Sequence, residues 1–219
     1  MFVTKEVLRY MSMPYEQADD DMKADILDTY EQLKQKCAPK VLLELFDISH
    51  TDNGIVISTN NFYIEGQDIL RTMKNANKMY VMVATLGMGA DMFIRQTQSL
   101  SMSQALIVNS CCNVLIESVC DNAEREIIEK LNDNEHLTMR YSPGYGDVPL
   151  TIQDGILAMM MAGKRIGLST TKSGMLVPTK SVTAFIGVSN QKEDRLRSCS
   201  SCAMKGTCKY RKRGDRCGH

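Results

Sequence analysis

The sequence predicts an α+β fold, with helices packed on one mixed, largely antiparallel sheet and a small cysteine-rich C-terminal tail. Residues 41–49 and 54–59 have the composition of strands, and an Asp-Asn-Gly turn at 52–54 joins them as in an antiparallel hairpin. Residues 79–87 are continuously apolar, which is typical of a strand buried on both faces. Residues 103–131 repeat apolar side chains at helical spacing and are long enough for a central helix.

The other elements follow from periodicity and from the residues that end each run. Pro14 separates a short N-terminal helix from a longer one, and Pro39 ends the second helix. We expect Gly163 to end the helix that begins near residue 151. The expected helices span residues 4–11, 15–37, 67–75, about 87–98, 103–131 and 151–162, and the expected strands span residues 41–49, 54–59, 79–87, 136–141, 175–177 and 181–188.

Charge and composition argue against several classes of protein. The 219 residues include 26 basic and 26 acidic side chains, so the chain has no overall basic field for nucleic acid. Its apolar runs are shorter than a membrane span, and the first ten residues carry charges where a signal peptide has its apolar core. We therefore expect a cytoplasmic protein without a membrane or nucleic-acid partner, whose cysteines are thiols, metal ligands or core residues.

Two patterns favour packing over chemistry. Gly87 and Gly89 form a G-x-G turn between a predicted strand and helix, as in dinucleotide-binding proteins, but Met92 stands where the third glycine belongs. We interpret this pattern as a tight strand-to-helix turn. Four cysteines outside the tail are expected to fill the core as small apolar residues. They are Cys37, Cys111, Cys112 and Cys120.

Residues 140–149 form a stiff, irregular segment between a predicted strand and a predicted helix. Pro143 and Pro149 restrict the backbone, whereas Gly144 permits backbone angles and close approaches that a side chain would prevent. Arg140 carries a planar fork of donors suited to a carboxylate or a phosphate. The alternative interpretation is an ordinary surface turn with an exposed arginine.

Two blocks of this sequence resemble the activation (reactivation) domain of cobalamin-dependent methionine synthase, in a free-standing form. Arg140, Gly144 and Tyr145 match the Arg-x-x-x-Gly-Tyr loop with which that family binds S-adenosylmethionine. Residues 166–188 match a second block with an Ile-Gly pair, a Thr/Ser-rich turn, Met-x-Pro and a Ser-Val strand, and residues 84–87 match short relatives of the domain. The residues that carry the second match are Ile166, Gly167, Ser173, Met175, Pro178, Ser181 and Val182.

The resemblance covers residues 1–188 and includes two departures from the family pattern. Lys172 lies in the turn where the family often has an acidic residue. Ile186, with Phe185 beside it, stands where the family has an aromatic residue near the ligand. The resemblance implies an activation-domain fold for residues 1–189.

For the loop, the resemblance implies an S-adenosylmethionine site at Arg140, Ser142, Gly144 and Tyr145. In that assignment Arg140 pairs with the carboxylate of the ligand. The backbone near Ser142 and Gly144 hydrogen-bonds the ligand, and Tyr145 packs against it and its sulfonium charge. The ligand then donates its methyl group to a corrinoid that has been reduced by one electron, so the protein's task is to position the reactants.

The corrinoid is expected on another protein. The family's cobalt-ligating motif is Asp-x-His-x-x-Gly, and His50, His136 and His219 all lie outside such a context. The implied partners are a corrinoid-binding methionine synthase or related methyltransferase and an electron donor such as a flavodoxin or ferredoxin. The alternative is a module that docks a corrinoid protein or senses S-adenosylmethionine without methyl transfer.

Residues 190–219 form a basic tail that is poor in apolar residues and rich in cysteine. Four cysteines in so short a polar segment predict a metal site, because they have no core to fill. Zinc and a 4Fe–4S cluster both take four thiolates, and an electron relay to cobalt favours the cluster. The alternatives are a basic tail with incidental cysteines and a zinc module for nucleic acid. The predicted ligands are Cys199, Cys202, Cys208 and Cys217.

Overall fold

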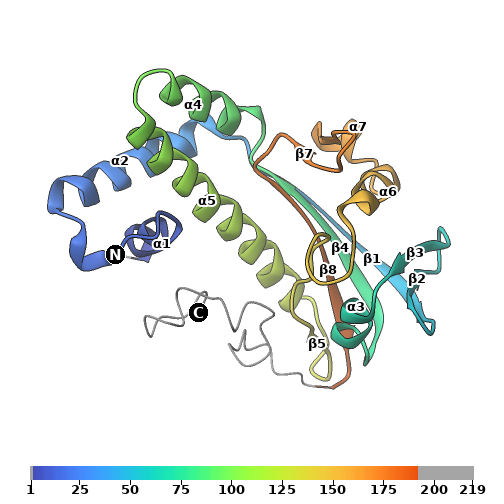
Figure 1. Cartoon of the computed structure of the whole chain (residues 1–219). Helices are drawn as coiled ribbons and strands as arrows, with labels where there is room; N and C mark the ends of the chain where they lie inside the picture. The colour runs from blue at the N-terminus through green and yellow to red at the C-terminus, as the bar shows by residue number, and fades with distance from the viewer. Residues whose placement is uncertain (1, 192–219) are drawn as a thin grey trace.

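A computed structural model describes residues 2–191 and confirms the predicted α+β class (Figure 1). The main sheet has six strands, and each of its pairings is antiparallel. In sheet order they are β3 (Phe62–Glu65), β2 (Gly54–Ile57), β1 (Lys40–His50), β4 (Ala76–Thr85), β8 (Ser181–Ser189) and β5 (His136–Leu137). A second, two-stranded sheet consists of β6 (Ser169–Thr170) and β7 (Leu176–Val177).

The helices cover both faces of the main sheet. They are α1 (Phe2–Tyr10), α2 (Asp20–Lys36), α3 (Gln67–Thr72), α4 (Met88–Gln98), α5 (Met102–Ile128), α6 (Gln153–Met159) and α7 (Ala162–Ile166), with 3₁₀ turns at Tyr15–Gln17 and Leu150–Ile152. One core joins the sheet to α5 and to the helices α1, α2 and α4 that pack on it. The other core lies on the opposite face, under α3, α6 and α7. In Figure 1, α5 runs between the N-terminal helices and the sheet.

Helix α5 is the predicted central helix, and its thiols lie in the core. Cys111, Cys112 and Cys120 are each 0% exposed, as expected for cysteines that act as small apolar residues. Within residues 2–191, α5 is also the one helix long and apolar enough to cross a membrane, which the sequence analysis had not expected. Because 56% of its most apolar window is buried inside the protein, α5 has the character of a core helix.

Several predicted helix boundaries were wrong, since α3 ends at Thr72 rather than residue 75 and α5 at Ile128 rather than residue 131, and two further ones have a clear structural cause. The long helix expected from residue 15 begins at Asp20, since Asp19 caps it by accepting a hydrogen bond from the backbone N–H of Met22 (2.8 Å). Gly163 does not end a helix but lies inside α7. The break falls at Met161, whose φ of 48° is left-handed.

The G-x-G pattern is a packing device, in agreement with the predicted tight turn. Gly87 has a φ of 79°, in the left-handed region that glycine adopts readily, and it joins β4 to α4. A Cβ atom on Gly89 would lie 2.0 Å from the backbone oxygen of Lys36 at the end of α2. The second glycine therefore lets α4 approach α2 closely.

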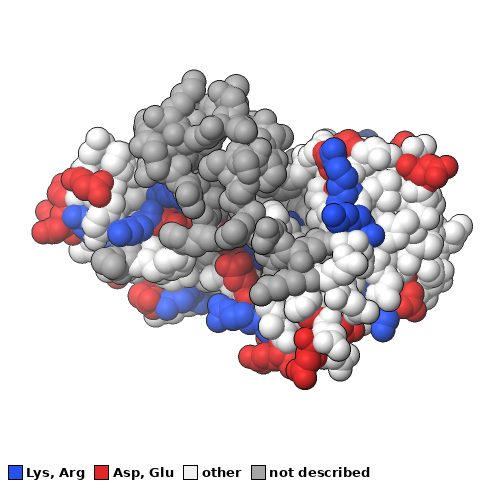
Figure 2. All heavy atoms as spheres, turned by 90° about the horizontal axis from the view of Figure 1, so that it is seen from below, with Lys and Arg blue, Asp and Glu red and all other residues white. Residues whose placement is uncertain are grey.

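Charged side chains on the face shown in Figure 2 are of both signs and are interspersed over its described residues. This distribution agrees with the equal numbers of acidic and basic residues in the chain.

Candidate functional site

The loop at 140–149 is attached to the main sheet at its first residues. Tyr141 and Phe185 exchange two backbone hydrogen bonds, of 2.9 and 2.7 Å, so the loop leaves the sheet beside β8. Inside the loop, the Gly144 N–H donates to the Val148 oxygen (2.8 Å), and the Tyr141 hydroxyl donates to the Tyr145 oxygen (2.7 Å). These internal bonds give the loop the stiffness that its sequence predicts.

The far end of the loop is attached to α3. The carboxylate of Asp147 accepts hydrogen bonds from the backbone N–H groups of Gln67 (2.6 Å) and Asp68 (3.2 Å), and so caps that helix from outside. Gly146 has a φ of 55°, and a Cβ atom there would lie 2.1 Å from an Asp68 oxygen. The contact thus requires glycine at 146 and an acceptor at 147, and no local sequence pattern indicated it.

Arg140 is not an exposed surface arginine, because its side chain is 7% exposed and carries three ion pairs. Its Nη2 lies 2.6 Å from an oxygen of Glu117, and its Nη1 lies 3.1 Å from Asp121 and 2.7 Å from Glu124. All three carboxylates project from α5. Burial works to lower the pKa of Arg140, but Cys120 and the carboxylates outweigh it and the pKa is raised.

Among the described residues, one guanidinium is shared by three carboxylates of α5. A ligand carboxylate that approached Arg140 would have to compete with Glu117, Asp121 and Glu124 for its donors. The predicted pairing of Arg140 with the carboxylate of S-adenosylmethionine stays a prediction.

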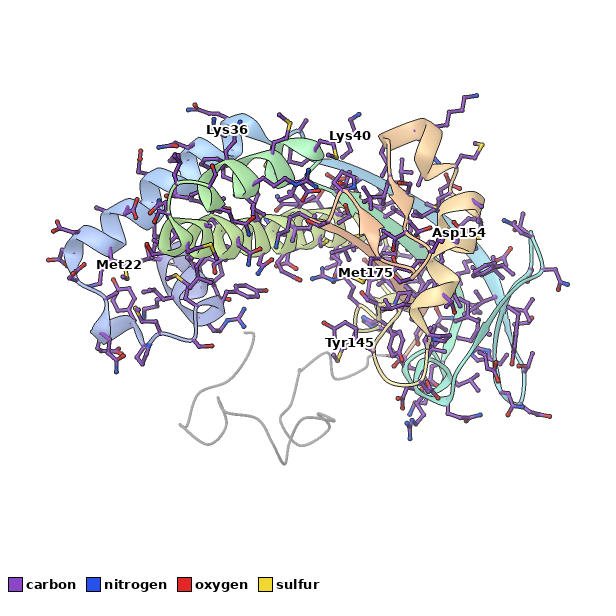
Figure 3. The ribbon with its side chains drawn as sticks, turned by 45° about the horizontal axis from the view of Figure 1, so that its top comes forward. Met22, Lys36, Lys40, Tyr145, Asp154 and Met175 are labelled. Atoms are coloured by element: carbon purple, nitrogen blue, oxygen red, sulfur yellow. The ribbon has the colours of Figure 1, made fainter. Side chains whose placement is uncertain are left out.

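A cleft of about 320 Å³ opens beside the loop, at the lower end of the roughly 300–1,000 Å³ range of small-molecule sites. Its walls come from α1, α5, the loop and the first residues of β8, and Tyr10, Glu117, Tyr145 and Lys180 are among the side chains that line it. Tyr145 is 70% exposed and projects outward from the loop in Figure 3. Since Glu117 also pairs with Arg140, the cleft and the arginine network share one carboxylate.

Of the four predicted ligand-binding residues, Tyr145 is the one that lines this cleft. Arg140 is connected to it through Glu117. Ser142 and Gly144 shape the loop: the Ser142 oxygen accepts a hydrogen bond from the Tyr145 N–H (3.2 Å), and Gly144 has a φ of 90°.

Lys180 is a cleft residue that the sequence analysis did not single out. Its ammonium donates to the side-chain oxygens of Asn109 (2.8 Å) and Asn113 (2.7 Å) on α5. The residue before it is fixed as well, because the Thr179 N–H donates to Asp91 (2.9 Å), which is 7% exposed. The sequence signal for this arrangement was the presence of Asn109 and Asn113, one turn apart, in the more apolar first half of α5.

The two departures from the family pattern lie away from the cleft. Lys172 is exposed in the turn between β6 and β7. Phe185 and Ile186 are each 0% exposed and belong to the two cores on opposite faces of the sheet. A side chain at 186 therefore does not reach a surface ligand.

The predicted metal ligands Cys199, Cys202, Cys208 and Cys217 lie outside the described residues. Within residues 2–191, no group of three or more His, Cys, Asp or Glu side chains is arranged to hold a metal ion. The described cysteines are unbridged, and burial raises the pKa of the Cys37 thiol to about 11 and of the other three to about 12. The three thiols on α5 are fully buried core groups, and Cys37 is half-buried.

No protein-family model and no curated protein matches this chain. Among solved structures, the chain is similar to the crystal structure of the MetH reactivation domain bound to AdoHcy, with a TM-score of 0.60 and 12% sequence identity. The match covers 87% of this chain and 77% of that one. At this identity the similarity establishes the fold, and it agrees with the fold that the two sequence blocks predicted. The chain has the fold of the MetH reactivation domain.

Proposed function

We propose that this chain binds S-adenosylmethionine in the cleft beside residues 140–149 and supports reductive methylation of a corrinoid carried by a partner protein. One observation carries the proposal: Tyr145 of the Arg-x-x-x-Gly-Tyr loop faces a polar cleft on α5, in the fold of a domain whose crystal structure holds AdoHcy. The partner would be a corrinoid-binding methionine synthase or a related methyltransferase, in the cytoplasm, with a flavodoxin or ferredoxin as electron donor.

The residues of the cleft fit the charges of this ligand. S-adenosylmethionine has a carboxylate, an ammonium group and a sulfonium group, and the cleft presents the ammonium of Lys180, the carboxylate of Glu117 and the ring of Tyr145. Carboxylate and aromatic faces both favour a sulfonium cation. The methyl group leaves a sulfonium that is already activated, so the chain needs no general base and acts by binding and orientation.

Calorimetry with the purified full chain tests binding. We expect one S-adenosylmethionine per chain and weaker binding of S-adenosylhomocysteine, which lacks the sulfonium charge that the acidic end of α5 attracts. ATP, which shares the adenosine but carries a polyphosphate, serves as the control and should not bind. The absence of S-adenosylmethionine binding at millimolar ligand would refute the proposal.

Methyl transfer separates the proposed activity from the alternative of a docking or sensing module. The assay combines S-adenosylmethionine labelled in the methyl group, a low-potential reductant and a purified corrinoid protein. We expect label on the corrinoid only when the chain, the reductant and the ligand are all present. Binding without transfer of label would favour the sensing module.

For the tail we keep the prediction of a metal site at Cys199, Cys202, Cys208 and Cys217. Anaerobically purified protein is expected to contain iron and sulfide and to absorb visible light, and a variant with these four cysteines changed to serine should lose both properties. Stoichiometric zinc without visible absorbance would instead identify a structural site and exclude an electron relay. If the protein contains neither iron nor zinc, the tail is a basic segment with incidental cysteines.

A further inference from the structure

Lys180 has the features of an anion-binding residue. An ammonium group has three N–H donors, and here two of them are used by the neutral amide oxygens of Asn109 and Asn113. Within residues 2–191, no carboxylate forms an ion pair with Lys180. Lys180 is one of the residues that line the cleft, so a ligand bound there would lie beside this side chain.

The charge of Lys180 is held in place and is only partly compensated by the described residues. Burial lowers the pKa of this lysine, whereas Cys112 and Asp91 raise it by less. A partly buried cation is normally paired with an anion, because desolvation disfavours its charge. An anionic group from a ligand would supply the missing partner.

Arg140 presents the opposite case. Its terminal nitrogens already face three carboxylates, so it is the less available of the two cations to a ligand carboxylate. A polar stripe on one face of α5 contacts both cations. Its first two residues accept hydrogen bonds from Lys180, and its last three pair with Arg140. The stripe consists of Asn109, Asn113, Glu117, Asp121 and Glu124.

The sign of the charge consequently changes along the cleft. Asn113, which holds Lys180, and Glu117 are four residues apart on α5, which is about 6 Å along a helix axis. This separation is comparable with the length of an extended methionine chain, which ends in a carboxylate on one side and a sulfonium on the other. The cleft thus offers a cation and an anion in the order that such a ligand requires.

We propose that Lys180 binds the carboxylate of the amino-acid portion of the ligand, while Glu117 faces the sulfonium group. The inference rests on the proposed function, because it takes the ligand to be S-adenosylmethionine. It makes Arg140 a positioning residue that holds Glu117 at the cleft rather than the residue that binds the carboxylate.

Decarboxylated S-adenosylmethionine provides the test, since it differs from the ligand only by loss of the carboxylate. We expect the full-length protein to bind S-adenosylmethionine about tenfold or more tightly than the decarboxylated form, as for a hydrogen bond to a charged group. Lys180→Met is expected to bring this ratio close to one while keeping the affinity for the decarboxylated form. Lys180→Arg should keep part of the preference, and Lys172→Met, which removes an exposed lysine outside the cleft, should keep all of it.

A purely structural role of Lys180 would weaken both ligands equally and leave the ratio unchanged, which would overturn the inference. The inference would also be overturned if the preference for S-adenosylmethionine over the decarboxylated form survived in Lys180→Met but disappeared in Arg140→Ala. If Lys180→Met fails to fold, Lys180→Gln removes the charge while keeping a side chain that can hydrogen-bond the two asparagines. Wild-type protein that binds both ligands equally refutes only the role of Lys180, whereas wild-type protein that binds neither refutes the proposed function as well.

Discussion

Replacing Arg140 with alanine is expected to lower the free energy of unfolding by about 2–3 kcal/mol and to weaken S-adenosylmethionine binding by about tenfold or more. The arginine is 7% exposed, and its removal takes away the cation that Glu117, Asp121 and Glu124 share. The expected loss of stability is smaller than for a fully buried ion pair, because the side chains of Glu117 and Asp121 are 43% and 59% exposed and water screens their charges. Binding should suffer because Glu117 no longer has a fixed position at the cleft.

Urea unfolding and calorimetry measure the two effects, with Arg165→Ala as the matched control. Arg165 also forms an ion pair with a glutamate, Glu44, but both side chains are 37% exposed and lie away from the cleft. The control should change the free energy of unfolding by about 0.5 kcal/mol and leave the affinity unchanged. If the two variants have the same free energy of unfolding and bind the ligand as the wild type does, the Arg140 network neither stabilises the fold nor supports ligand binding.

Replacing Gly89 with alanine is expected to lower the free energy of unfolding by about 1–3 kcal/mol, through overpacking. The new Cβ atom would lie 2.0 Å from the backbone oxygen of Lys36, and neither helix can yield without moving its backbone. Chemical denaturation at several urea concentrations gives the difference directly.

Gly163→Ala is the control for this substitution. Gly163 also lies in a helix, α7, but its nearest atom to a new Cβ is the Leu168 oxygen at 3.6 Å, an ordinary contact. Because alanine favours a helix more than glycine, this variant should be neutral or more stable by up to about 1 kcal/mol. If the two substitutions changed the free energy of unfolding equally, the packing of α4 against α2 would not depend on the absence of a side chain at residue 89.

The fold could be predicted from the sequence wherever a few neighbouring residues determine a helix, a strand or a turn. The turn at 52–54 produces the β1–β2 hairpin, with Ile48 opposite Ile57, and the apolar run of β4 lies in the middle of the sheet. Short elements such as β3 and β6 escaped prediction because two to four residues contain too little periodicity. The break at Met161 escaped it because a left-handed methionine has no sequence signature.

The candidate site could be predicted from the sequence only in part. Pro143, Gly144 and Tyr145 marked a stiff loop, and the loop is stiff because of bonds within itself. Its fixed position also depends on Asp147, which caps a helix 80 residues earlier in the chain. Contacts of this range leave no periodic trace in the sequence, since either partner alone looks like an ordinary polar residue.

The sequence by itself determined the α+β class, the order of the main elements, the stiffness of residues 140–149 and the presence of an arginine at their start, because turn residues and apolar periodicity act over a few residues. Only the tertiary structure decided which charges meet. It placed Arg140 among three carboxylates of α5 and left Lys180 at the cleft with two amide partners and no carboxylate within the described chain. The reason is that electrostatic partners are chosen by distance and burial in space, and residues 16 to 71 positions apart become neighbours only when the helix packs on the sheet.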